Sequence, residues 1–75
     1  MFWLVYDTDK GRQVLLQPAG TLIHARFAAG VHKLIDGDFV EGHMLEASHI
    51  KLIPKNMVGK PLTAKQASSL LRKLA

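Results

Sequence analysis

The stretch GTLIHARFAAGVHKLIDG, residues 20–37, decides the fold of this chain because two different structures fit it. In the helical interpretation, Thr21 is the N-cap, three alanines support the helix, and Asp36-Gly37 ends it. One face of this helix would then carry the apolar side chains Ile23, Phe27, Val31, Leu34 and Ile35.

In the strand interpretation, the same stretch alternates between two faces from Leu22 to Phe27, turns at residues 28–30 and continues into residues 31–35. A hairpin signal follows at Asp36-Gly37. In the middle of a helix, Gly30 would cost about 1 kcal/mol relative to alanine. We weigh the two interpretations almost equally and favour strands for residues 21–35.

The residues before this stretch indicate an N-terminal β-hairpin over residues 2–17. Residues 2–7 are aromatic and β-branched, and their nearly unbroken apolar run indicates a strand that is buried on both faces. The turn sequence TDKG at residues 8–11 separates it from a second strand, which ends at Pro18. We expect Trp3 in the core, with a stacking platform for a single-stranded base as its alternative role.

The residues after the stretch indicate two more short strands, over 38–46 and 49–54, and then a loop over 55–62. The last element is an amphipathic helix over residues 63–74. Thr63 occupies its N-cap position, and Gln66 three residues later completes a capping box. The apolar stripe of this helix consists of Ala67, Leu70, Leu71 and Leu74.

These elements predict a single α+β domain over residues 1–75. A small antiparallel sheet of four to five short strands packs against the C-terminal helix, and an SH3-like barrel with an added helix is a special case of this arrangement. If residues 21–35 are helical instead, the sheet has fewer strands and the covering layer has a second helix.

Charge is distributed unevenly along the chain, whose formal net charge is +4. The first 49 residues contain four basic and six acidic side chains, whereas the residues from Ile50 onward contain six basic side chains and no acid. A basic cluster of this kind is typical of proteins that contact the phosphates of nucleic acid. The residues that we expect to contact phosphate are Lys60, Lys65, Arg72 and Lys73, with Lys51 and Lys55 at the rim. An acidic protein is the alternative partner.

No combination of residues indicates catalysis, a cofactor or a metal site. The chain has no cysteine, its four histidines lack the spacing of a zinc-binding helix, and glycine-rich phosphate loops are absent. The sequence shows no secretion leader and no apolar run long enough to span a membrane. We therefore expect a non-enzymatic protein of the cytoplasm that needs no cofactor.

The apolar content of 48% leaves a surplus beyond the core, which a small chain can bury by forming a homo-oligomer. A second hypothesis for the function follows from this surplus. The chain would be a protein-interaction or structural accessory protein, of the type that phages or mobile elements encode, acting through an apolar or dimer interface. We expect the exposed apolar patch around Met44, Leu45, Met57 and Val58.

Overall fold

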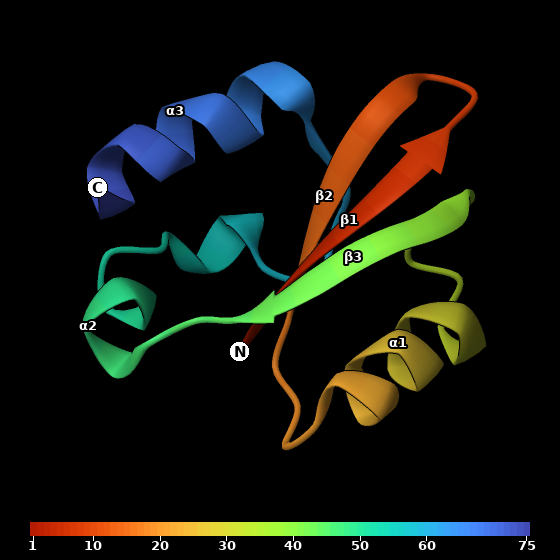
Figure 1. The fold of residues 1–75 in the computed structure, drawn as a ribbon, viewed down its shortest axis with the longest axis horizontal. Helices are drawn as coiled ribbons and strands as arrows, with labels where there is room; N and C mark the ends of the chain where they lie inside the picture. The colour runs from red at the N-terminus through yellow and green to blue at the C-terminus, as the bar shows by residue number, and fades with distance from the viewer.

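Strands and helices follow one another along the chain with short connections (Figure 1). The computed structural model describes all residues, 1–75. In chain order, the elements are β1 (Phe2–Thr8), β2 (Gly11–Gln17), α1 (Leu22–Val31), β3 (Asp38–Met44), α2 (Ala47–Ile50), the 3₁₀ helix η1 (Lys55–Met57), β4 (Leu62–Thr63) and α3 (Ala64–Leu74).

The strands form one antiparallel sheet in the order β3-β1-β2-β4. The register of the first hairpin pairs Phe2 with Gln17 and Thr8 with Gly11. β1 is buried from Phe2 to Tyr6, because side chains on both of its faces are covered. These observations confirm the predicted α+β fold with an antiparallel sheet and a C-terminal helix.

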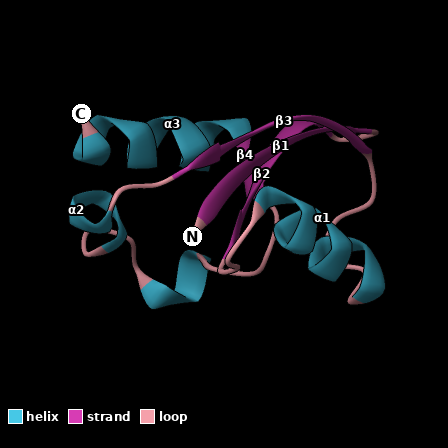
Figure 2. Ribbon diagram, turned by 60° about the horizontal axis from the view of Figure 1, so that its bottom comes forward, coloured by secondary structure: helices cyan, strands magenta, loops and turns pink.

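One face of the sheet packs against α3 (Figure 2). The buried residues of this layer are Trp3, Val5, Val14, Leu16, Ile53, Leu62, Ala67 and Leu70. Trp3 is thus a core residue, as expected, and is not open for stacking on a base.

The opposite face of the sheet packs against α1. The buried residues of this layer are Phe2, Leu4, Tyr6, Leu15, Ala25 and Ala29. Gly42 of β3 permits the close approach of α1, because a Cβ atom at this position would lie 2.5 Å from Cδ1 of Leu22. The sheet is therefore the middle of three layers, with its two longer helices on opposite sides.

Residues 22–31 are helical, so the strand interpretation of residues 21–35 is wrong. Thr21 is the N-cap, and its Oγ1 accepts a hydrogen bond of 3.2 Å from the N–H of His24. The helix does not join the layer of α3, as the helical alternative supposed, but covers the other face of the sheet. Asp36-Gly37 forms no hairpin turn and lies on the connection from α1 to β3.

The way α1 ends explains part of the difficulty in choosing between a helix and strands for residues 21–35. The N–H of Leu34 donates to the carbonyl of Ala29 over 3.0 Å, and the N–H of Lys33 donates to that of Gly30 over 3.2 Å. This pair of bonds is a Schellman motif, in which glycine is the usual residue at the left-handed position. Lys33 occupies that position here, with a φ of 51°. The usual sequence signal for the end of a helix is therefore missing.

Residues 49–54 do not form the predicted strand. They contain the end of α2 and a turn, and among them only Ile53 is buried, in the layer under α3. Because only one side chain of this segment is buried, the segment does not need the extended backbone of a strand. Its alternation of apolar and polar residues is therefore not matched by pairing with the sheet. Instead, Leu62 and Thr63 form β4 by pairing with β2.

The C-terminal helix has the predicted capping box. The N–H of Gln66 donates to Oγ1 of Thr63 over 3.1 Å, and the N–H of Thr63 donates to Oε1 of Gln66 over 2.9 Å. Ala67 and Leu70 are buried and Leu74 is partly buried, which agrees with the predicted stripe. Leu71 departs from it, because this residue is 52% exposed.

Candidate functional site

Three of the predicted basic side chains project from α3. Ala67 and Leu70 fix the side of the helix that packs on the sheet. A turn of 100° per residue then places Lys65 and Arg72 on the opposite side and Lys73 on a flank. All three residues are exposed.

A hollow of about 260 Å³ lies between α3 and η1. Lys65 and Lys73, about two helical turns apart, line it together with Gln66 and Ser69, and Met57 contributes from η1. Met57 and Leu70 make the exposed lining of the hollow mainly apolar, and the two cations, the amide and the hydroxyl surround it. Polar side chains of these kinds are the ones that proteins use to bind phosphate oxygen atoms.

The three predicted cations outside α3 lie on the connection between β3 and β4. Lys51 follows α2, Lys55 begins η1, and Lys60 precedes β4 by two residues. α2 lies near the C-terminal end of α3 in both views (Figures 1 and 2), and Met57 of η1 packs against the core under α3. The structure thus brings Lys65 and Lys73 onto one hollow and leaves the other four predicted residues, Arg72 included, outside it.

None of these cations forms an ion pair. The ion pairs of the chain join Arg12 to Asp7 at 2.9 Å and His43 to Glu41 at 3.6 Å. Asp7 and Asp38 lie side by side where β1 ends and β3 begins, close to the first hairpin turn. The free cations form what we call the basic surface, which consists of Lys51, Lys55, Lys60, Lys65, Arg72 and Lys73.

The expected apolar patch is wrong for most of its residues. Leu45, Met57 and Val58 are partly buried and pack against the core under α3. Met44 alone is largely open, with 69% of its surface exposed. The sequence argument failed because Leu45, just after β3, and Met57 and Val58, at the end of η1, pack inward against the core cluster that contains Trp3.

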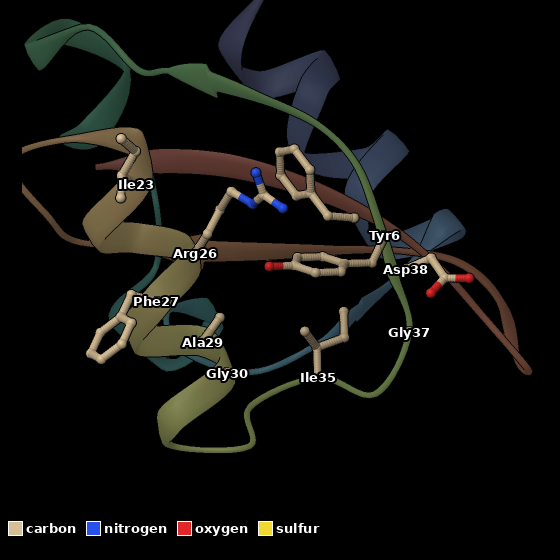
Figure 3. Close-up of a pocket in the computed structure, with 10 residues that line it drawn as sticks. Tyr6, Ile23, Arg26, Phe27, Ala29, Gly30, Ile35, Gly37 and Asp38 are labelled. Atoms are coloured by element: carbon tan, nitrogen blue, oxygen red, sulfur yellow. The ribbon is translucent and has the colours of Figure 1, made fainter.

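Unlike most surface helices, α1 buries small residues and exposes its large apolar ones. Its small residues Ala25 and Ala29 pack on the sheet, whereas Ile23, Phe27 and Val31 are 77%, 70% and 57% exposed. We call these three exposed residues the outer stripe of α1. In Figure 3, the side chains of Ile23 and Phe27 point away from the strands.

Sequence reasoning missed this surface. The helical interpretation placed the outer stripe on one face together with Leu34 and Ile35, but it did not identify that face as exposed. The usable signal was the pair Ala25 and Ala29, one turn apart, because two small side chains let a helix approach a sheet closely.

A second hollow, of about 500 Å³, lies beside the outer stripe, between α1 and residues 35–39. Arg26 extends from α1 toward Tyr6 (Figure 3), and its Cζ lies 3.9 Å from the centre of the Phe39 ring in a cation–π contact. The rings of Tyr6 and Phe39 meet edge to face, with their centres 5.5 Å apart. Asp38 also lines this hollow, and neither Arg26 nor Asp38 has an ion-pair partner.

Burial raises the pKa of Tyr6 above its ordinary value, and the positive charge of Arg26 opposes this shift by favouring the tyrosinate. The hollow beside α1 is therefore lined by one neutral phenol and one cation that lie close together, whereas the carboxylate of Asp38 points away from both (Figure 3).

No three histidine, aspartate or glutamate side chains come close enough to hold a metal ion. None of the helices combines the length and the apolar character needed to cross a membrane. No protein-family model, curated protein or solved structure matches this chain. The function must therefore be argued from the geometry of the chain itself.

Proposed function

We propose that this protein is a non-enzymatic module that binds nucleic acid through its basic surface. The observation that carries the proposal is the presence of six exposed cations without one ion pair among them. Such cations displace the counterions that condense along a phosphate backbone, and the release of these counterions drives binding.

The distribution of the cations favours a long polyanion over a small anion. They extend from α2 through η1 to the last turn of α3, and only Lys65 and Lys73 share a hollow. A nucleic-acid backbone presents phosphates continuously and can contact several of these positions at once. Trp3 is buried, so the mode of binding that we propose depends on phosphate contacts and has little sequence preference. The proposal places the protein in the cytoplasm.

The test is fluorescence anisotropy with labelled random-sequence duplex and single-stranded DNA over a series of salt concentrations. Binding by four to six cations predicts that the logarithm of the affinity falls with the logarithm of the salt concentration with a slope of about −3 to −5. In the variant Lys65→Gln plus Lys73→Gln, the loss of two phosphate contacts should make this slope shallower by about 2.

The matched control is Lys10→Gln plus Lys33→Gln, which removes the same amount of charge from exposed positions outside the basic surface. It should change the slope little. Absence of binding at low salt would contradict the proposal. An equal change of the salt slope in both double variants would show that net charge, and not the basic surface, determines binding. An acidic protein would then be the partner to search for.

A second candidate function is protein interaction through an apolar interface, including a homo-oligomer. The outer stripe of α1 favours it, because its three large apolar side chains have no partner within the chain. The two functions are compatible, since α1 and α3 cover opposite faces of the sheet.

A further inference from the structure

We infer that the outer stripe of α1 and the hollow beside it form the interface of a two-fold symmetric homodimer. The surplus of apolar surface is large, because only 14 of the 75 residues are buried while 48% of the chain is hydrophobic. α1 is a well-formed helix, closed by Thr21 at its start and by the Schellman motif at its end. Its exposed apolar side chains are therefore a fixed surface and not a frayed segment.

The spacing of the outer stripe suits a second copy of the same helix. Ile23 and Val31 lie four residues before and after Phe27, so the stripe is symmetric about its central residue. When two such helices pack antiparallel across a two-fold axis, Phe27 lies near the axis and Ile23 of each copy faces Val31 of the other. Each exposed side chain of the stripe thereby gains an apolar partner.

Gly30 provides an independent indication on the same side of α1. It lies three residues after Phe27, and no atom of the chain lies within 4 Å of the place where its Cβ would be. Glycine inside a helix costs about 1 kcal/mol relative to alanine, and packing within the chain gives no reason for it here. The missing side chain leaves a notch that can receive a large residue, such as Phe27, from the second copy.

Charge does not oppose a second copy at this surface. Arg26 is engaged within the chain by its cation–π contact with the Phe39 ring, and the carboxylate of Asp38 points away from it (Figure 3). The outer stripe itself consists of uncharged side chains, so apolar complementarity selects its partner.

The same region is electrically suited to self-association in a protein of net charge +4. Residues 22–38 contain two basic and two acidic side chains, so this part of the molecule has a formal charge of zero. Lys65, Arg72 and Lys73 of the basic surface belong to α3, on the other face of the sheet. Two copies can therefore meet through α1 with these cations turned away from each other.

Pairing through the sheet edge is a weaker route to a dimer. The edge strand β3 has a register shift opposite Val5 and Tyr6, where Val40 is the additional residue. Asp38 and Glu41 also place negative charge on this strand. A bulge and like charges are the devices by which proteins prevent edge strands from pairing.

A ten-residue helix is about 15 Å long, so its interface lies at the small end of stable protein interfaces. We therefore expect a dissociation constant in the micromolar range. The measurement is sedimentation equilibrium without nucleic acid, from about 1 µM to about 1 mM protein. The mass should rise from 8.3 kDa to twice this value.

Phe27→Glu should weaken the dimer by at least about tenfold, because it places a charge at the centre of the interface. The matched control is Leu71→Glu, which makes the same kind of change at an exposed position of α3 and should leave the mass unchanged. Gly30→Gln should fill the notch and weaken the dimer while stabilising α1. Circular dichroism of each variant separates these effects from loss of folding.

A wild-type protein that stays monomeric up to about 1 mM, or a dimer unaffected by Phe27→Glu, would overturn the inference. Because no nucleic acid is present, this result and that of the anisotropy experiment can fail independently.

Discussion

Lys33 has a backbone conformation that lysine seldom adopts, since its φ of 51° is the one positive value among the non-glycine residues. The left-handed conformation costs an L-residue about 1–2 kcal/mol, whereas glycine adopts it freely but loses about 0.5–1 kcal/mol more through entropy. We expect Lys33→Gly to raise the free energy of unfolding by about 0.5–1 kcal/mol, measured by urea denaturation at one fixed protein concentration. Lys10→Gly, in the hairpin turn at an ordinary φ, should bring no gain. Equal effects of the two substitutions would refute this explanation.

Tyr6 is the only tyrosine of the chain, so its ionisation can be followed directly by ultraviolet absorbance. Its folded-state pKa is raised above the ordinary value of 10.0. The folded state therefore holds this proton more tightly than the unfolded state does. The resulting stability is fully present below about pH 10 and is lost as the pH rises through the folded-state pKa.

Arg26 opposes the shift of the pKa of Tyr6, so Arg26→Gln should raise this pKa further. Lys65→Gln, on the other side of the sheet, should leave the titration of Tyr6 unchanged. A lower pKa in Arg26→Gln would show that the guanidinium does not act on the phenol as the structure indicates.

At the scale of elements, α3 depends on its capping box. Thr63→Ala removes the acceptor for the N–H of Gln66, and it should lower the free energy of unfolding by about 1 kcal/mol. Ser68→Ala is the control, because Ser68 is exposed within the same helix and makes no side-chain hydrogen bond. Urea denaturation of both variants decides the question. A loss no larger in Thr63→Ala than in Ser68→Ala would mean that the cap contributes nothing.

The elements that the sequence predicts correctly are those whose local signals agree with their tertiary role. The apolar run of β1 is buried on both faces, and the capping box of α3 begins the helix that packs on the sheet. α1 was missed because large apolar residues usually mark the buried side of a helix, and here alanines are buried instead. β4 is two residues long and exists only through its pairing with β2, which no local pattern encodes.

The charge of the candidate site was predictable from the sequence, but its arrangement in space was not. The number and sign of its charges follow from composition alone. Two further properties arise from tertiary structure and could not be read from spacing: Lys65 and Lys73 share a hollow with η1, and the acids form no ion pair with the basic surface.

At the scale of the whole molecule, the cations of α3 and the outer stripe of α1 lie on opposite faces of the sheet. Exposed apolar side chains are not confined to α1, because Ile50, Leu52 and Leu71 are also exposed beside the cations. One chain of 75 residues thus carries the cations of α3 and the outer stripe on either side of a thin shared core.

The placement of the two longer helices on opposite faces of the sheet has a consequence for valency. A dimer joined through α1 presents the α3 cations of its two copies outward, facing away from each other. If the proposed dimer and the proposed nucleic-acid binding both hold, one dimer would hold two separate segments of nucleic acid, or two distant parts of one strand. Once the first segment is bound, the second site would act at a high effective concentration, so such a dimer would cross-link and compact nucleic acid instead of simply coating it.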